Sequence, residues 1–222
     1  MSVAAVPFQA VVFDNDGLLL DTEEAWTRAE ETLFERRGRT FTIEHKRYII
    51  GSSRAVAASK LETMLNLPGE GEPLMDELHE LVMEEALAGV PPRPGAIELL
   101  DALGAAGTPI GLASNSSREF LERTLSTAGL LNGRFGCVIS ADEVENPKPA
   151  PDLYLAACRE LGADPAACAA LEDSPPGVAS AAAAGLFVIA VPYFPDQTVP
   201  GASLLAGSLA DPEVAAALGL DG

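Results

Sequence analysis

Two acidic residues one position apart, Asp14 and Asp16, follow the short apolar run 9–13, which predicts a buried strand ending in a turn. Two carboxylates with this spacing can face one crevice, where they repel each other unless a cation or a shared proton intervenes. Such a pair can bind Mg²⁺, and one acid can act as a nucleophile while the other donates a proton. The structural alternative is that one acid caps the next helix and the other solvates the turn.

A second polar site, Ser114 and Asn115, follows the apolar run 109–113 and precedes a predicted helix. The free N–H groups at a helix start favour an anion, and a hydroxyl and an amide can bind phosphate oxygens. Helix capping by a serine is the alternative explanation of this site.

A third and a fourth site supply a cation and two more acids. Lys148 stands between two prolines, which stiffen its backbone and suit an ammonium group aimed at a fixed anion. A surface lysine in a proline-rich turn is the alternative. Glu172 and Asp173 end the apolar run 169–172 and could complete an oxygen shell for Mg²⁺. Asp173 could instead cap the next helix.

These four sites require a scaffold that brings strand ends together. Strands are expected at 9–13, 109–113, 136–140, 169–172 and 186–191, and helices at 95–106, 117–128, 150–162 and 174–184. This alternation predicts an α/β fold with a parallel sheet covered by helices on both faces. Because parallel strands end at one edge of their sheet, all four sites should meet there.

The region from 20 to 90 breaks the alternation, because it shows helical patterns with no strand between them. One amphipathic stripe is expected to be packing: Leu74, Met75, Leu78, Leu81 and Val82. Proline and glycine between 89 and 95 indicate a linker. We therefore predict a core of residues 1–19 and 91–222 with an inserted helical domain of residues 20–90.

Composition excludes several classes of function. A net charge of −19 from 14 basic and 33 acidic residues argues against a nucleic-acid partner. The sequence has no stretch of about 18 apolar residues, and residues 1–10 lack the pattern of a targeting segment. The three cysteines show no metal-binding spacing. We expect a cytoplasmic monomer with no membrane association.

The order of the sites resembles the haloacid dehalogenase superfamily. Its four motifs match Asp14-Asn15-Asp16-Gly17, Ser114-Asn115, Lys148-Pro149 and Glu172-Asp173. The insertion resembles the α-helical cap of the subgroup that contains β-phosphoglucomutases and small sugar-phosphate phosphatases. The resemblance implies a Rossmann-like core with a mobile cap.

The resemblance also implies roles for individual residues. Asp14 would attack phosphorus, and Asp16 would protonate the leaving group and then activate water. Mg²⁺ would be held by the Asp14 carboxylate, the Asp16 carbonyl and Asp173, with Glu172 behind these ligands. The phosphoryl-binding residues would be Ser114, Asn115 and Lys148.

Three further residues bear on the reaction. The carboxylate at Asp16 argues against the dehalogenase branch. Arg54 resembles an arginine that contacts the distal part of the substrate, although an exposed arginine at a helix start is the alternative. Trp26 stands where β-phosphoglucomutases carry a histidine, which favours a phosphatase, although it could equally be a cap-core residue.

The expected function is Mg²⁺-dependent hydrolysis of a small phosphorylated metabolite, foremost a sugar phosphate. The alternatives are a β-phosphoglucomutase-type isomerase and a non-enzymatic binding module. The binding module would be expected to lack one of the catalytic acids, and all of them are present.

Overall fold

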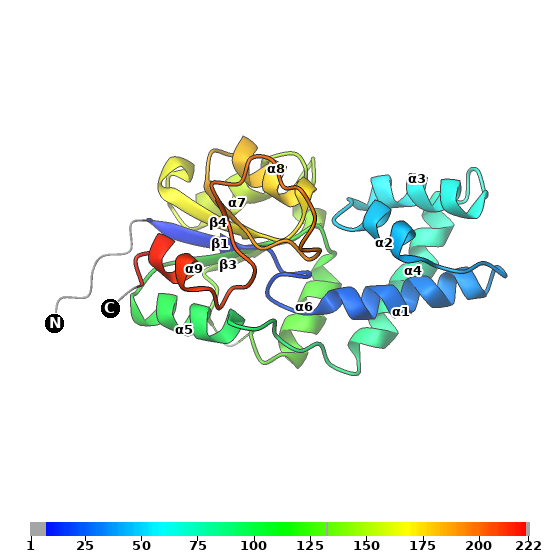
Figure 1. Cartoon of the computed structure of the whole chain (residues 1–222), viewed down its shortest axis with the longest axis horizontal. Coiled ribbons are helices and arrows are strands. Elements are labelled where there is room, and N and C mark those ends of the chain that lie inside the picture. The colour runs from blue at the N-terminus through cyan, green and yellow to red at the C-terminus, as the bar shows by residue number, and fades with distance from the viewer. Residues whose placement is uncertain (1–7, 132, 221–222) are drawn as a thin grey trace.

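The core of the protein is a six-stranded parallel sheet with the strand order β3-β2-β1-β4-β5-β6 (Figure 1). The computed structural model describes residues 8–131 and 133–220. The strands are β1 (Ala10–Phe13), β2 (Ile110–Ala113), β3 (Cys137–Ile139), β4 (Cys168–Glu172), β5 (Phe187–Ala190) and β6 (Leu204–Leu205). The parallel α/β core predicted from the sequence is confirmed, with β1 at its centre.

Helices cover both faces of the sheet because side chains alternate along the buried strands. Val11 and Phe13 of β1 pack toward α5 (Ala96–Ala105), α6 (Arg118–Thr127) and α9 (Pro212–Ala217). Ala10 and Val12 point the other way, toward α7 (Asp152–Glu160) and α8 (Pro175–Ala183). Burial of a side chain such as Phe13 contributes roughly 2–3 kcal/mol to stability.

The helical insertion has a hydrophobic core of its own. It consists of α1 (Thr22–Glu35), α2 (Ile43–Ile49), α3 (Arg54–Leu65) and α4 (Gly71–Ala86). The predicted apolar stripe is buried in that core: Leu74, Met75, Leu78, Leu81 and Val82. Phe120 of α6 joins the same cluster, so the sheet domain supplies part of its packing. Figure 1 shows these four helices at the end of the molecule opposite the described chain ends.

Two linkers connect this helical unit to the sheet domain, and they are hydrogen-bonded to each other. The Asp21 amide donates to the Pro91 carbonyl, and the Arg93 amide donates to the Leu19 carbonyl, both at 2.9 Å. The two crossings therefore lie side by side, as a hinge requires. We propose that the cap extends from residue 20 to residue 90.

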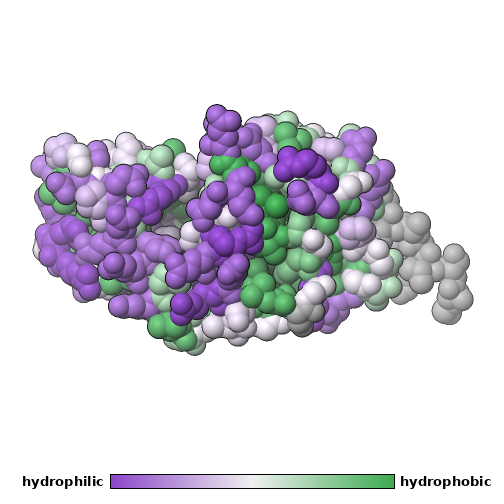
Figure 2. All heavy atoms as spheres, turned by 180° about the vertical axis from the view of Figure 1, so that it is seen from behind, coloured by the Kyte–Doolittle hydropathy of each residue, from purple (hydrophilic) through white to green (hydrophobic). Residues whose placement is uncertain are grey.

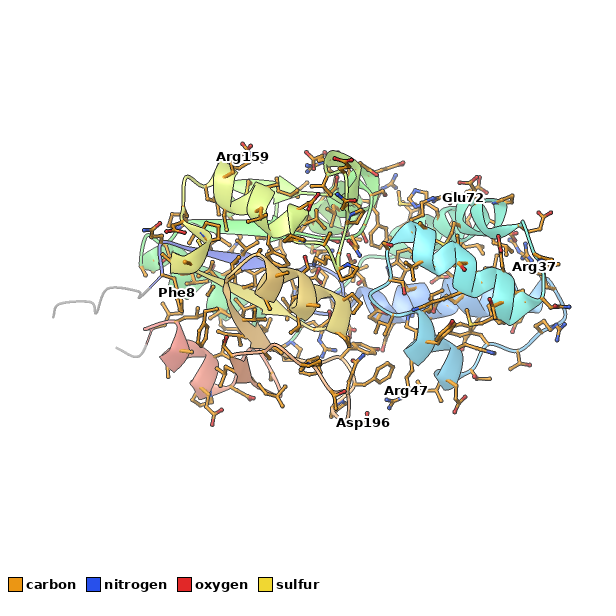
Figure 3. The ribbon with its side chains drawn as sticks, turned by 90° about the horizontal axis from the view of Figure 1, so that it is seen from above. Phe8, Arg37, Arg47, Glu72, Arg159 and Asp196 are labelled. Carbon is orange, nitrogen blue, oxygen red and sulfur yellow. The ribbon has the colours of Figure 1, made fainter. Side chains whose placement is uncertain are left out.

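Beyond the linkers and the Phe120 contact, the cap lies against the sheet domain at α2 and at Gly51. Arg47 of α2 pairs with Asp196 at 2.9 Å, and its guanidinium lies 4.2 Å from the ring centre of Phe194. Figure 3 shows Arg47 and Asp196 facing each other. At the second place, a Cβ added to Gly51 would lie 2.8 Å from the Cβ of Ser174. The cap is therefore closed over the carboxyl edge of the sheet.

The face of the cap that is seen from behind is mainly polar (Figure 2). Figure 2 shows a mainly hydrophilic cap face from behind, beside a band of hydrophobic residues over the sheet domain. None of the helices in the described ranges 8–131 and 133–220 is both long and apolar enough to cross a membrane. The prediction about a targeting segment in residues 1–10 falls largely on residues 1–7, outside the described residues.

Short elements escaped the sequence analysis. β6 has two residues and α9 has six, and the 3₁₀ turns η1 (Ala141–Glu143) and η2 (Pro165–Ala167) have three each. Segments this short carry too few residues for a periodic pattern.

Candidate active site

The predicted site residues meet at the carboxyl ends of three adjacent strands. Asp14 follows β1, Ser114 follows β2, and Glu172 is the last residue of β4. Sheet hydrogen bonding continues into the first two, because the Asp14 amide donates to Leu171 and the Ser114 amide donates to Ile139, both at 3.0 Å. The chain order reverses between β1 and β4, which is where open parallel sheets bind ligands.

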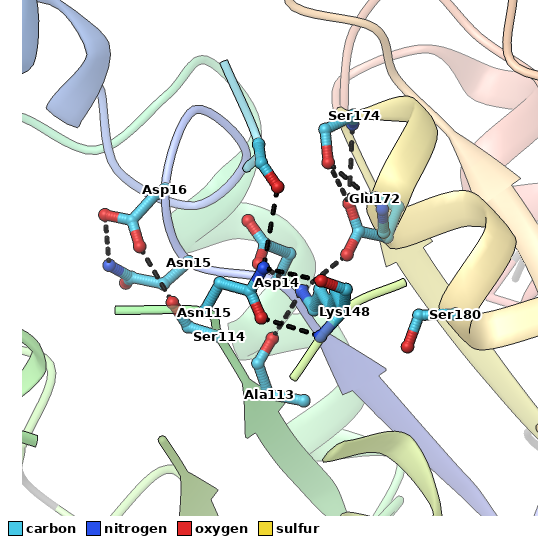
Figure 4. A network of polar contacts seen from close by, with 12 residues as sticks. Asp14, Asn15, Asp16, Ala113, Ser114, Asn115, Lys148, Glu172, Ser174 and Ser180 are labelled. Carbon is cyan, nitrogen blue, oxygen red and sulfur yellow. Dashed lines mark hydrogen bonds and ion pairs between the residues drawn. The ribbon is translucent and has the colours of Figure 1, made fainter. Parts of the chain in front are cut away.

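Lys148 is the buried cation at the centre of the site (Figure 4). Its Nζ donates to Asp14 Oδ1 at 2.5 Å, to Glu172 Oε1 at 2.6 Å and to the Ala113 carbonyl at 2.8 Å. Burial alone would lower the pKa of Lys148, but the two carboxylates raise it above its usual range. The ammonium group is therefore charged and its three donors are satisfied.

Glu172 holds Lys148 in place. Its Oε1 also accepts from the Tyr154 hydroxyl at 2.7 Å, and its Oε2 accepts from the Asp173 amide at 3.1 Å. A Cβ added to Gly177 would lie 2.0 Å from this carboxylate, so α8 approaches closely enough to need glycine there. Tyr154 is fully buried on α7, and the sequence analysis did not identify it.

The acidic residues at this edge form a group suited to a cation. Asp14, Glu172 and Asp173 can each offer one oxygen within 4.8 Å of the others. Asp173 Oδ2 is buried and has no hydrogen-bond partner among the described residues. Burial raises the pKa of both Asp14 and Asp173 well above ordinary values, and the neighbouring carboxylates add to this. Hard oxygen ligands with unrelieved repulsion fit Mg²⁺.

Asp16 has a different environment from Asp14. Its Oδ2 accepts from the hydroxyls of Ser114 and Ser116, both at 2.8 Å, and its Oδ1 accepts from the Asn15 amide group at 3.2 Å. These contacts fix the Asp16 carboxylate at the β2 side of the site. Ser114 thus contacts the second acid in this structure, and Ser116 is a site residue that the sequence analysis missed.

Asn115 supports the loop that carries Lys148. Its Oδ1 accepts from the Lys148 amide at 2.8 Å, while its Nδ2 donates to the Lys148 carbonyl at 3.2 Å. The same Nδ2 lies 3.5 Å from the Gly51 carbonyl of the cap. The Asn115 amide therefore connects the loop that carries Lys148 to the cap.

The cap contributes one wall of the cavity above these residues, including Trp26, Arg54 and His79. The half-buried Trp26 ring lies 5.5 Å from the Phe120 ring. The Arg54 guanidinium is bound to two acids of α4, Glu72 and Asp76, and its side chain is 45% exposed.

The two histidines differ in position. Of the two, His79 lies next to the site. It is partly buried on α4 and faces the cavity, because the face of that helix that packs also borders the site. His45 closes a capping box with Thr42 at the start of α2 and packs against Phe34.

A buried charge cluster in the cap was also missed. Lys46 of α2 pairs with Glu23 at 2.6 Å and with Glu30 at 3.1 Å, and all three side chains border the cavity. We call these residues the cap triad. Two carboxylates raise the pKa of Lys46 despite its burial. Burial raises the pKa of Glu30 to about 7, because Lys46 only partly offsets the lost hydration and Glu23 repels it.

Relatives of known sequence match almost the whole chain. A probable pseudouridine-5'-phosphatase of Drosophila melanogaster is 36% identical over 90% of this chain and 89% of its own length. A bifunctional riboflavin kinase/FMN phosphatase of Arabidopsis thaliana is 34% identical over 85% of this chain, which spans about half (49%) of that protein.

Solved structures agree in fold. CbbY of Rhodobacter sphaeroides in complex with phosphate superposes with a TM-score of 0.79 at 28% identity, over 92% of this chain and 96% of CbbY. A mutant of the same protein was solved with xylulose-(1,5)bisphosphate, with the same TM-score of 0.79 and 27% identity.

The family match spans the site. The family model for haloacid dehalogenase-like hydrolases matches residues 8–185, which include all four motifs and the helical insertion. The chain therefore belongs to the haloacid dehalogenase-like hydrolase family.

Proposed function

We propose that the protein is a Mg²⁺-dependent phosphatase that hydrolyses a small phosphorylated metabolite, foremost a sugar phosphate, through an aspartyl-phosphate on Asp14. The observation that carries this proposal is the pairing of two acids in different environments. Asp14 is buried against Lys148, whereas Asp16 is half-buried and held by two serine hydroxyls. Such a difference suits a nucleophile beside a separate proton donor.

In the first half of this reaction, an Asp14 carboxylate oxygen forms a bond to phosphorus as the bond to the leaving oxygen breaks. Asp16 delivers its proton to that oxygen, which departs as an alcohol. In the second half, Asp16 takes a proton from water as the water oxygen attacks phosphorus. Asp14 is then released as a free carboxylate, together with inorganic phosphate.

Asp14 and Asp173 are the side chains that would hold Mg²⁺, with the Asp16 carbonyl as the further ligand that the family resemblance implies. When bound, the cation would neutralise the clustered carboxylates and polarise the phosphoryl oxygens. Lys148 adds fixed positive charge where negative charge spreads over the transferring group. Glu172, whose oxygens are engaged by Lys148, Tyr154 and backbone amides, keeps that ammonium oriented.

Phosphoric monoester hydrolysis agrees with the names of the relatives. The Drosophila and Arabidopsis proteins are named as phosphatases of pseudouridine 5'-phosphate and FMN, and CbbY was solved with phosphate. Pseudouridine 5'-phosphate and FMN are small phosphorylated compounds with large hydroxylated leaving groups. We extend that chemical class, rather than any one of those substrates, to this chain.

We place the activity in the cytoplasm, in a monomer. Cys137, Cys158 and Cys168 are free thiols in the described structure, which suits a reducing compartment. Burial raises the pKa of Cys158 to about 12 and that of Cys137 to about 11, so neither is a ready thiolate.

The direct test is phosphate release by the metal-stripped protein, measured before and after Mg²⁺ is added back, across sugar phosphates, nucleotides and glycerol phosphates. Glucose 6-phosphate formation from β-glucose 1-phosphate is followed in parallel. Metal-dependent release with no isomerisation supports the proposal. Isomerisation without release would assign the chain to the mutase type instead. Release that is unaffected by metal removal would contradict the metal's part in it.

A further inference from the structure

The three lysine and arginine side chains that border the cavity among the described residues share one arrangement: each is held between two carboxylates. The pairs are Lys148 with Asp14 and Glu172, Lys46 with Glu23 and Glu30, and Arg54 with Glu72 and Asp76. The two lysines are therefore balanced by buried carboxylates, whereas Arg54 is balanced by exposed ones. A bound cation would add positive charge only at the Lys148 end, where the transferring phosphoryl group would lie.

The cap triad lies next to the reacting end of the cavity. A Cβ added to Gly17 would lie 3.2 Å from the Cγ of Glu23 and 2.3 Å from Oδ2 of Asp173. Glu23 thus adjoins the proposed metal ligands, and Lys46 and Glu30 continue from it into the cap. The leaving group of a phosphate ester attacked by Asp14 would occupy the cavity that the triad borders.

Burying three ionisable side chains costs hydration free energy, which is unfavourable for a purely structural contact. Lys46 is 4% exposed and Glu30 3%, so both have lost most of their hydration. Buried ion clusters are often no more stable than apolar residues of similar volume, so holding α1 against α2 does not require one. Carboxylates accept hydrogen bonds and an ammonium donates them, which is the set that a polyhydroxylated molecule can satisfy.

We propose that Glu23, Lys46 and Glu30 form a leaving-group subsite that selects phosphate monoesters whose leaving group is uncharged and bears hydroxyl groups, and that rejects bisphosphates. This inference rests on the proposed phosphatase function and names its substrate class. Hydroxyl groups can share the hydrogen bonds of the triad. A second phosphate placed at the triad would meet two carboxylates around one ammonium, with no unbalanced cation there to repay its lost hydration.

The test compares kcat/KM for ribose 5-phosphate, ribulose 1,5-bisphosphate and 4-nitrophenyl phosphate. The parent should prefer ribose 5-phosphate over the bisphosphate by about tenfold or more. At pH 8, above the pKa of about 7 that burial gives Glu30, Glu30→Gln removes one negative charge with little change in shape and leaves Lys46 with a single carboxylate. That variant should lower the preference at least about fivefold, through better use of the bisphosphate and poorer use of ribose 5-phosphate.

The matched control is Arg36→Gln, at the residue that follows the same helix, because Arg36 is 55% exposed and pairs with Glu77 at the surface. It should keep the parental preference. The parent alone gives a second measure that needs no variant, namely inhibition of 4-nitrophenyl phosphate hydrolysis. Ribose 5-phosphate should inhibit at about tenfold lower concentration than the bisphosphate.

The two levels of the proposal fail in different ways. Equal use of the bisphosphate by the parent, or an unchanged preference in folded Glu30→Gln, would overturn the subsite while leaving the phosphatase intact. Absence of phosphate release from all three compounds, with Mg²⁺ present, would overturn the phosphatase function and this inference with it.

Discussion

The ammonium of Lys148 and the carboxylate of Asp14 lie 2.5 Å apart, although 134 positions separate the two residues in the chain. Both are buried, at 2% and 6% exposure. The contact forms because the loop after β3 returns to the carboxyl end of β1, and Asn115 binds that loop through both atoms of its amide. A nucleophile and a fixed positive charge thus share one end of the cavity.

Lys148→Ala should lower kcat about 10²-fold or more, because the charge that stabilises the transferring phosphoryl group is lost. It should also lower stability by roughly 3 kcal/mol, since Asp14 and Glu172 would be left buried without their cation. Steady-state kinetics and urea unfolding measure the two effects. A variant with parental kcat would remove Lys148 from the reaction.

Tyr154→Phe tests whether Glu172 needs its full set of donors. The lost 2.7 Å hydrogen bond leaves Glu172 Oε1 with Lys148 alone, which should cost about 1–2 kcal/mol of stability. The fall in kcat should be only a fewfold, because Lys148 still contacts Asp14. Thermal unfolding and kinetics provide the readouts, and a loss of activity as large as that of Lys148→Ala would contradict this supporting role.

Gly51→Ala should prevent full closure of the cap. Gly51 has a φ of +70°, and a Cβ there would press on Ser174 at 2.8 Å. We expect KM to rise and kcat/KM to fall about tenfold, because the cap then excludes water and orients substrate less well.

The matched control for Gly51→Ala is Gly69→Ala. Gly69 has a φ of +83° but no atom within 4 Å of an added Cβ. Both substitutions carry the cost of a left-handed backbone, about 1 kcal/mol, but only the first blocks the cap. Equal kinetics in the two variants would show that the Gly51 contact does not control closure.

Glu30 should make stability depend on pH. Its pKa is about 7 in the folded protein against 4.5 when unperturbed, because burial outweighs Lys46 while Glu23 and Glu31 repel it. A raised carboxyl pKa means that the folded state keeps a proton that the unfolded state loses. The contribution of Glu30 to the free energy of unfolding is therefore full below about pH 4.5 and is lost as the pH rises through 7.

The comparison that isolates this effect is parent against Glu30→Gln, which cannot titrate at this position. Between pH 5 and pH 8, the free energy of unfolding of the variant should rise relative to that of the parent by up to about 3 kcal/mol. Urea unfolding at several pH values measures it. A constant difference across this range would show that Glu30 is ionised throughout.

The sequence was most informative where function and strand ends coincide. Asp14 and Ser114 each follow a short apolar run, and Glu172 ends one. A parallel sheet brings such strand ends together, so this meeting can be predicted without knowledge of any side-chain contact. The structure agrees for the sheet, its two layers of helices and the meeting of the four sites.

The residues that were missed depend on contacts between distant segments. Ser116 reads as part of a helix cap, and Tyr154 reads as an ordinary apolar position on an amphipathic helix. Lys46 and its two glutamates come from two helices whose relative placement no local pattern encodes. His79 differs from its exposed neighbours only because α4 happens to border the cavity. Long-range packing decides each of these cases.

The most direct test of the central claim is phosphate release by Asp14→Asn in the presence of Mg²⁺, beside the parent and at equal concentration. The change is nearly isosteric but removes the nucleophilic oxygen, so circular dichroism should be parental while the rate falls about 10³-fold or more. Release at a substantial fraction of the parental rate by a folded Asp14→Asn protein would contradict the assignment of Asp14 as the nucleophile.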